Sequence, residues 1–276
     1  MDLVTIRASS LPELFDCPAK WEAKHVNKMR LPSSPASTLG HAVHAGTAAY
    51  DLANMHGKPI SVDDATGELV DTIYKPKDDV DWGDSKPQEA EKIGINLLRN
   101  YCATIAPQFN FVGVEATCER LEITDIGLAL TGTTDRIYQT ISDDPFGDPL
   151  SARPIYGVAD IKTGAKAVSA SGHVETKGHA AQLGVYELLA SILIKQKLEA
   201  PAVIMGLQTA KTAKAQRVAT GYIEGASELL VGTDERKGYL DMAASIVRSG
   251  SFYGNPRSML CTEKYCPTYN SCTWRR

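Results

Sequence analysis

Residues 157–166 read GVADIKTGAK and combine a short apolar run with two opposite charges. The apolar run is typical of a buried strand. Asp160 and Lys162 are two residues apart, so in a strand their side chains point to the same face. Such a pair is either an ion pair at a sheet edge or part of an active site. The rest of the chain has to decide between these two interpretations.

The overall composition bounds the class of protein. With 276 residues, 43% hydrophobic and 22% charged, the chain suits a soluble globular protein with one elaborated domain or two small ones. A net charge of −4 excludes a polycation that binds nucleic acid over its whole surface, so such a ligand would need a local basic groove. No apolar run is long enough to span a membrane, and the start MDLVTIRASS has no signal-peptide stretch. We therefore expect a cytoplasmic protein with no membrane partner, located in a bacterium or, if phage-encoded, in its host.

Strand and helix patterns alternate on both sides of the opening stretch. They predict one α/β domain over 1–276 with a mixed central sheet flanked by helices. It divides into a helical N-terminal region (1–105), a strand-rich core (106–230) and a C-terminal helix with a cysteine cluster (231–276). Residues 58–88 carry eight acids between Asp63 and Asp84 and are expected to be a loop-rich, solvated insertion. The expected strands are 112–123, 127–140, 154–164, 201–210 and 217–224. One helix is expected to begin at Ser9 or Ser10, and three others are expected over 40–57, 86–105 and 179–196.

A second acid, Asp135, stands 25 residues before Asp160 in the segment TGTTDRI. Taken alone, it would be a turn residue. A hairpin-length connection containing DDPFGDP (143–149) joins its strand to the opening stretch, which can bring Asp135 and Asp160 side by side. Two close carboxylates repel each other, and a divalent cation relieves that repulsion. Oxygen ligands favour magnesium or manganese, at which Lys162 would then point.

This arrangement resembles the PD-(D/E)XK nuclease superfamily, with Asp135 as the first acid and Asp160-Ile161-Lys162 as the triplet. The D-x-K pattern alone is weak, because it occurs by chance in many proteins. GHAVH, ending at His44, resembles the G-x-x-x-H helix of the RecB-like branch, whose histidine binds the metal. Read without the other motifs, His44 would be a hydrogen-bonded structural residue.

Two further features bear on the same branch. QLGVY, from Gln182 to Tyr186, resembles its Q-x-x-x-Y helix. These two side chains could equally satisfy each other on a core-packed helix, since they are four residues apart. An additional acid seen in some relatives would be Glu115 or Glu119, and the sequence does not choose between them.

The cysteines are unevenly distributed. Six cysteines in a cytosolic chain argue against a disulfide scaffold, and three of them in the last sixteen residues indicate a metal site. The iron–sulfur members of the RecB-like branch, which include AddB-type and CRISPR-adaptation nucleases, use one cysteine before the histidine helix and three near the C-terminus. The resemblance therefore implies a clasp of the two chain ends around an iron–sulfur cluster, 4Fe-4S. The terminal spacing of four then five residues departs from the two-then-five AddB-type spacing, and a four-cysteine zinc site stays open. The implied ligands are Cys17, Cys261, Cys266 and Cys272.

The resemblance implies a restriction-endonuclease-like core and a metal-dependent deoxyribonuclease. His44, Asp135, Asp160 and the carbonyl of Ile161 would hold one or two magnesium or manganese ions, and Lys162 would position the attacking water. Gln182 and Tyr186 would bind the DNA strand. We expect an exonuclease acting on ends or single strands in recombination, repair or phage DNA processing. The alternatives are a CRISPR-adaptation-type nuclease and a non-catalytic module for DNA or partner binding with a vestigial site.

The expected partner is DNA, bound as single strands or duplex ends. No GxxxxGK[ST] motif is present, so a helicase motor, or a recombination or annealing protein, would be a separate partner. Basic residues near the first helix and in the 211–217 segment are candidate phosphate contacts, although solvated surface charge is the commoner role of a lysine. These candidates are Lys20, Lys24, Lys28, Arg30, Lys211, Lys214 and Arg217.

Overall fold

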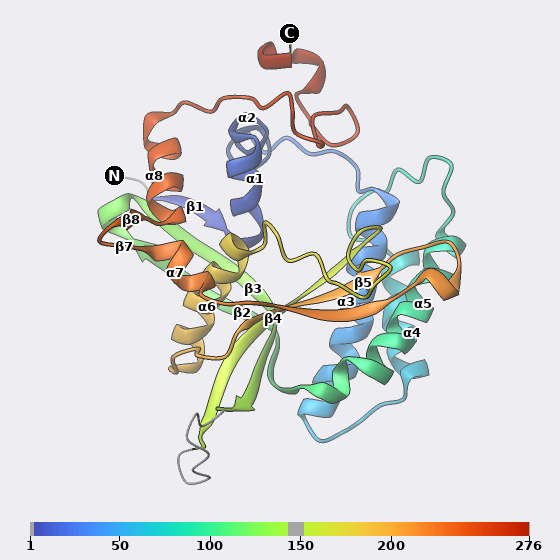
Figure 1. Ribbon diagram of the computed structural model, residues 1–276. Coiled ribbons are helices and arrows are strands. Elements are labelled where there is room, and N and C mark those ends of the chain that lie inside the picture. Colours follow the sequence, from blue (N-terminus) through green and yellow to red (C-terminus); the bar gives the residue numbers. More distant parts are fainter. Residues whose placement is uncertain (1–2, 143–151, 276) are drawn as a thin grey trace.

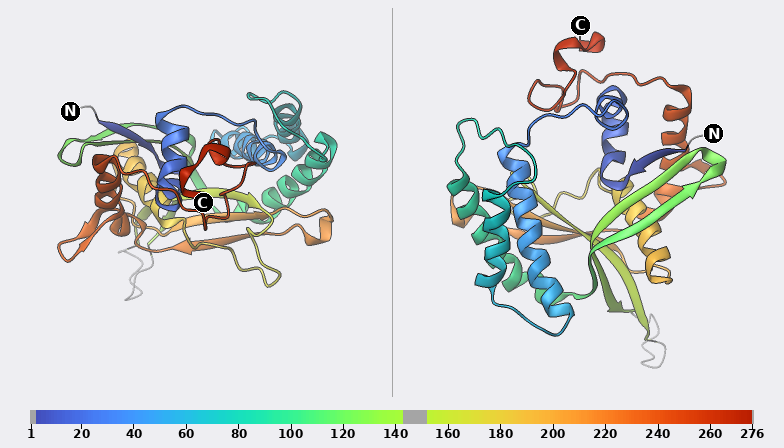
Figure 2. Two further views of the ribbon diagram at one scale, coloured as in Figure 1. Left: turned by 90° about the horizontal axis from the view of Figure 1, so that it is seen from above. Right: turned by 180° about the vertical axis from the view of Figure 1, so that it is seen from behind.

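The computed structural model describes residues 3–142 and 152–275, in which a mixed sheet lies between two groups of helices (Figure 1). The predicted DDPFGDP connection lies outside the described residues. Helices α1, α6, α7 and α8 cover one face of the sheet, and α3, α4 and α5 cover the other (Figures 1 and 2). The helices are α1 Leu11–Asp16, α2 Pro18–Trp21, α3 Pro35–Met55, α4 Val62–Tyr74, α5 Pro87–Thr104, α6 Ala180–Ile194, α7 Ala226–Val231 and α8 Tyr239–Ser249.

The predicted mixed sheet is confirmed, and β3 organises it. The strands are β1 Val4–Arg7, β2 Asn110–Ile123, β3 Leu128–Ile141, β4 Pro154–Gly164, β5 Ala202–Gln208 and β6 Val218–Ile223, with a small separate hairpin of β7 Gly232–Thr233 and β8 Arg236–Lys237. One edge of β3 pairs with the antiparallel strand β2. The other edge is shared, because β1 pairs in parallel with residues 128–131 and β4 pairs antiparallel with residues 136–141.

The sheet forks where β4 leaves β3. From Ala159 onward β4 pairs in parallel with β5, which in turn pairs with the antiparallel strand β6. Residues 132–135 of β3 therefore lie between the end of the β1 ladder and the start of the β4 ladder. Asp135 and Asp160 lie one step past the last β3–β4 pair, Arg136 with Ala159. The fork thus holds both acids of the sequence motif.

Two hydrophobic cores fill the space on either side of the sheet. Val158 of β4 packs in the core that includes α6, while Ala159 and Ile161 pack in the core that includes α3, α4 and α5. Because successive strand residues alternate between faces, Asp160 and Lys162 lie on the α6 side with Val158. No helix in residues 3–142 or 152–275 is both long enough and apolar enough to cross a membrane.

The prediction of a loop-rich, solvated insertion at 58–88 is wrong. Helix α4 forms within it, and a capping box between Ser61 and Asp64 starts the helix. Ala65, Leu69 and Ile73 recur at intervals of four residues and are fully buried against α3 and α5. Four of the acids occupy exposed positions of α4 and the other four follow the helix, so counting acids concealed the helical pattern.

The N-terminus also differs from the prediction. The single helix expected from Ser9 or Ser10 is divided into α1, α2 and a π-helical turn at Glu22–Val26. Pro18 begins α2, and a residue before proline avoids the helical region. Cys17 accordingly has an extended backbone, with φ −150° and ψ 91°. Strand β1, which the sequence analysis missed, has only four residues and owes its place to the parallel pairing with β3.

Candidate active site

Three neighbouring strands each carry an acid at the level of the fork. Val114 and Ala116 of β2 pair with Arg136 and Thr134 of β3, so Glu115 lies opposite Asp135. Asp135 in turn lies opposite Asp160 of β4. The backbone N–H of Ile161 donates a hydrogen bond of 2.7 Å to Asp135 Oδ2, which fixes that carboxylate in the gap between β3 and β4. The acids therefore form a row across the sheet.

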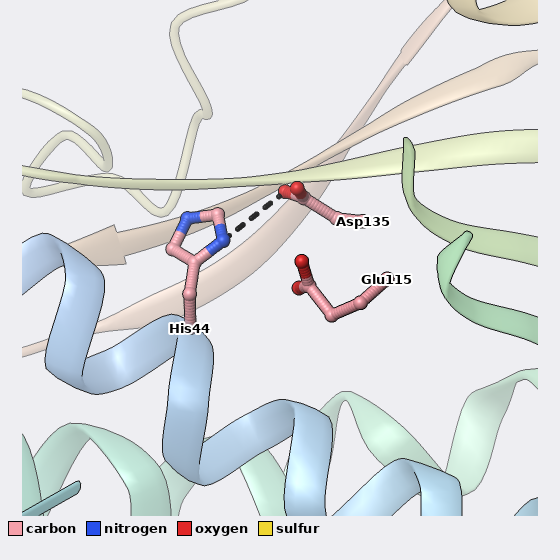
Figure 3. Close-up of side chains that lie close together, drawn as sticks. All are labelled: His44, Glu115 and Asp135. Atoms are coloured by element: carbon pink, nitrogen blue, oxygen red, sulfur yellow. Dashed lines mark ion pairs between the residues drawn. The ribbon is translucent and has the colours of Figure 1, made fainter. Parts of the chain in front are cut away.

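His44, Glu115 and Asp135 converge on one point (Figure 3). Each offers one ligand atom, and these atoms lie within 4.8 Å of one another. His44 comes from α3; its Nδ1 lies 3.5 Å from Asp135 Oδ2, and its Nε2 lies 2.9 Å from the carbonyl oxygen of Ile161. Glu115 has φ +46°, in the left-handed region that is rare for residues with a side chain and recurs at functional sites. Of the two acids that the sequence left open, Glu115 belongs to this group and Glu119 does not.

A second group of side chains lies beside the first, on the α6 face. Lys162 Nζ lies 2.7 Å from Asp160 Oδ2 and donates to Gln182 Oε1 at 3.0 Å. Gln182 Nε2 donates to Asp160 Oδ1 and to the hydroxyl of Tyr186, both at 3.1 Å. The side chains of Gln182 and Tyr186 are each only 5% exposed. Their hydrogen bonds join them to each other and to the Asp160–Lys162 pair. Their contact with a DNA strand stays a prediction.

Burial and crowding of like charges shift the pKa values of this row. Burial raises the pKa of Asp160 to about 6; the charge of Lys162 opposes the shift and that of Asp135 adds to it. Burial also raises the pKa of Asp135, but the charge and hydrogen bond of His44, together with the Ile161 N–H, outweigh it and lower the value overall. Burial lowers the pKa of His44, and the three surrounding carboxylates raise it above its usual value. The pKa shifts in this row therefore arise from burial together with the mutual attraction of the imidazole and the carboxylates.

The residues present fit a divalent cation. Asp160 Oδ2 is buried, and its charge partner in the described part of the chain is the Lys162 ammonium, 2.7 Å away. A buried carboxylate is costly unless its charge is paired. One imidazole together with carboxylates is a donor set that can hold a divalent cation. A cation among these groups would offset the repulsion between the carboxylates.

Comparison with known families agrees with this site. The family model described as the PD-(D/E)XK nuclease superfamily matches residues 6–273. The chain belongs to the PD-(D/E)XK nuclease superfamily. Membership implies a metal-dependent nuclease, a hydrolase that acts on nucleic acid with DNA as the substrate. No individual curated protein matches the sequence well enough to narrow this assignment.

The candidate site opens into a cleft of about 820 Å³ between α3, the end of α4 and strands β2 and β4. His44, Glu115 and Lys162 line it, whereas Asp160 lies beneath, 2% exposed. The segment after α4 forms the opposite wall and is tied to the residues before α3, since Ser33 N–H donates to Asp79 O at 2.8 Å. Lys75 and Lys77 of this wall also line the cleft. The sequence analysis missed both; their signal was the KPK tripeptide just after the last apolar position of α4.

One of the predicted phosphate contacts is wrong. Lys20 is 4% exposed, and its ammonium lies 3.0 Å from Glu13 Oε1, so it is not available to DNA. Lys24 also donates to Glu13, at 2.9 Å, but remains partly exposed. The sequence pattern of the first helix did not predict that Lys20 and Lys24 both form ion pairs with Glu13. Lys28, Arg30, Lys211 and Lys214 are exposed and Arg217 is partly exposed; for all five and for Lys24, phosphate contact stays a prediction.

The four cysteines predicted to act together line one cavity, between the start of α2 and the C-terminal segment. Cys17 Sγ accepts a hydrogen bond from Asn255 N–H at 3.4 Å. Burial raises the pKa of Cys261, and the three other thiols of the set raise it further. The remaining two cysteines are buried elsewhere, and burial raises the pKa of Cys102 to about 12, as expected for a structural thiol.

Proposed function

We propose that this chain is a magnesium- or manganese-dependent exodeoxyribonuclease that acts on DNA ends or single strands. Recombination, repair or phage DNA processing is the proposed context, in the cytoplasm and with a separate helicase or annealing protein as partner. One observation carries the proposal: the group of His44, Glu115 and Asp135 adjoins the Asp160–Lys162 pair at the floor of an open cleft.

His44, Glu115, Asp135 and Asp160 would hold the metal. A bound divalent ion polarises a scissile phosphate and lowers the pKa of a water bound to it. The role of the Ile161 carbonyl as a ligand stays a prediction; its contact with His44 Nε2 also suits a role in orienting the imidazole, so that Nδ1 faces the carboxylates. Ile161 therefore supports the site through both its N–H and its carbonyl.

Lys162 is suited to act on the water and on the phosphate. Its ammonium is fixed between Asp160 and Gln182, yet the side chain is 30% exposed and reaches the cleft. A fixed positive charge there would position the attacking water and stabilise the charge that develops on the phosphoryl oxygens. Gln182, itself bonded to Tyr186, holds both members of the Asp160–Lys162 pair, which supports a positioning role for these two residues.

Digestion of end-labelled DNA tests this function. With magnesium, single- and double-stranded substrates should be shortened from an end, whereas circular single strands should resist. Replacing Lys162 with methionine should slow cleavage about a hundredfold to a thousandfold. Lys237→Met, at an exposed position on β8, is the matched control and should cut like the parent.

Each other outcome has a definite meaning. Cleavage of the circle would replace the exonuclease with an endonuclease. Binding without any cleavage would favour the vestigial binding module, and parental activity of Lys162→Met would contradict the mechanism. A CRISPR-adaptation role would use the same site.

At the cysteine cavity we propose a 4Fe-4S cluster. Cys17, Cys261, Cys266 and Cys272 supply the number and kind of ligand that such a cluster needs. A four-cysteine zinc site would use the same four ligands. Anaerobically purified protein should contain iron and absorb visible light; zinc without iron would contradict the proposal.

A further inference from the structure

Arg136 follows Asp135 directly and is the largest charged side chain in the core. Its side chain is 0% exposed, between the sheet and α3. Burying an arginine costs several kcal/mol unless its donors are satisfied. Four hydrogen bonds from its guanidinium offset this cost. The acceptors of these bonds belong to the elements that carry the candidate metal ligands, which suggests a role for Arg136 in addition to packing.

The guanidinium reaches α3 on one side. Its Nε donates to Asp51 Oδ2 at 2.7 Å, and its Nη2 donates to Thr47 Oγ1 at 3.1 Å. Thr47 and Asp51 follow His44 by three and seven residues, one and two turns further along the same helix. The hydroxyl of Tyr101 donates to the same Asp51 oxygen at 2.6 Å and fixes that carboxylate from α5. Arg136 is thus bonded to the helix that presents the histidine.

On its other side, the same group reaches β2 and β3, two of the three acid-bearing strands. Its Nη1 donates to the carbonyl of Asp135 at 2.7 Å and to Glu115 Oε1 at 3.4 Å. One guanidinium therefore contacts each of the elements α3, β2 and β3, which carry the ligand group His44, Glu115 and Asp135. Five donors in a rigid fork make arginine suited to hold three elements at once, which the single ammonium of a lysine does less well.

We propose that Arg136 is a positioning residue that preforms the metal site, by holding Glu115 and the backbone of Asp135 in register with the helix of His44. This inference rests on the proposed metal-dependent function. Glu115 depends most on this contact. Its side chain is 42% exposed and its backbone is in the left-handed region, so without Arg136 it would be drawn toward solvent and away from Asp135. Contacts one shell beyond the ligands commonly change metal affinity 10- to 100-fold.

The test is the dissociation constant for Mn²⁺ without DNA, measured by electron paramagnetic resonance, with Asp135→Asn as the blank for other sites. Arg136→Lys keeps the charge beside Asp51 but loses the fork, and should weaken Mn²⁺ binding about tenfold or more. Its cleavage rate should recover largely at saturating metal, because no reacting group is removed. Failure of the parent protein to bind Mn²⁺ would overturn the proposed function and this inference together.

Tyr138→Phe is the matched control. Tyr138 lies two residues further along β3 on the same face, is 4% exposed and donates to the Pro201 carbonyl at 2.6 Å, away from the ligands. This variant should lose stability without any change in Mn²⁺ affinity. If Arg136→Lys does not fold, Thr47→Val is the second variant. It removes the acceptor of the Arg136 Nη2 hydrogen bond and should weaken Mn²⁺ binding about threefold. Parental affinity in a folded Arg136→Lys, or in Thr47→Val if Arg136→Lys does not fold, would leave Arg136 a structural residue only.

Discussion

The two candidate metal sites of this nuclease are built in opposite ways. At the fork, the ligands come from a long helix and from paired strands, and Arg136 joins those elements from within the core. At the cysteine cavity, Cys17 lies at a helix break and its partners lie in the segment after α8, whose regular structure consists of short 3-10 turns. Folding of the core therefore forms the first site, whereas the second depends more on what binds there.

The cysteine side is nevertheless not unstructured. Ala19 N–H donates to the Tyr253 carbonyl at 3.0 Å, and the ring of Phe252 stacks on Trp21 with centroids 6.1 Å apart. Figure 1 shows the C-terminal segment passing over α1 and α2 before the chain ends. Beyond these contacts Met259 is 85% exposed. Protein contacts therefore bring the two chain ends together.

The largest expected effect separates activity from stability at the fork. Asp135→Asn should lower the cleavage rate about a thousandfold or more, because it removes a charged metal ligand. The thermal unfolding temperature should stay close to that of the parent, because the surrounding core is unchanged. Asp63→Asn, at an 85% exposed carboxylate on α4, removes the same charge and should cut normally. Parental activity of Asp135→Asn would refute the assignment of the site.

The next largest effect is expected at the cysteine cavity, where a substitution should lower local stability more than the cleavage rate. Cys272→Ser should lower the bound iron and make residues 250–275 sensitive to limited proteolysis, while the rest of the domain stays resistant. Cys118→Ser replaces a buried cysteine outside the cavity and should keep its iron. Iron content and mass-mapped fragments are the measurements. Unchanged iron in Cys272→Ser would show that this residue is not a ligand.

A smaller effect is expected at Glu13, beside the cysteine cavity. Burial raises its pKa, but hydrogen bonds from His25 and Lys24 and the charge of Lys20 lower it to about 2, below its usual 4.5. The stabilisation is therefore complete above pH 4.5 and is lost as the pH falls toward 2. After allowance for partial exposure, Glu13→Gln should lower the free energy of unfolding by about 2 kcal/mol at pH 7. Urea unfolding at pH 7 and pH 3 measures this, and an equal loss at both values would contradict it.

The smallest effect tests the cleft wall. Lys77→Ala should raise the KM for DNA about threefold and leave kcat nearly unchanged, because one phosphate contact is lost. The salt dependence of KM should become shallower. Lys58→Ala, an exposed lysine outside the cleft lining, is the control. A fall in kcat with constant KM would instead assign Lys77 to the chemical step.

The hydrophobic pattern of the sequence predicted much of the fold and the proximity of the two acids of the main motif. Strand periodicity located β2 to β6, and the connection between β3 and β4 placed Asp135 near Asp160. It failed at residues 58–88, where eight acids outweighed the three apolar positions of α4, and at the four-residue β1, which forms only because β3 offers an edge. Local patterns report what a segment prefers, and short or highly charged segments are decided by their tertiary partners.

For the site, sequence spacing was enough to put Asp160 and Lys162 on one strand face, whereas the resemblance to iron–sulfur nucleases grouped Cys17 with the terminal cysteines. Only the tertiary structure chose Glu115 over Glu119, turned Lys20 inward to Glu13 and put Lys77 beside the cleft. It alone revealed that Arg136 joins three ligand-bearing elements. The physical reason is that a period of two defines the face of a strand, but not where two strands part. The chemistry of GVADIKTGAK depends on that point, because the fork at Ala159 opens the sheet beside Asp160.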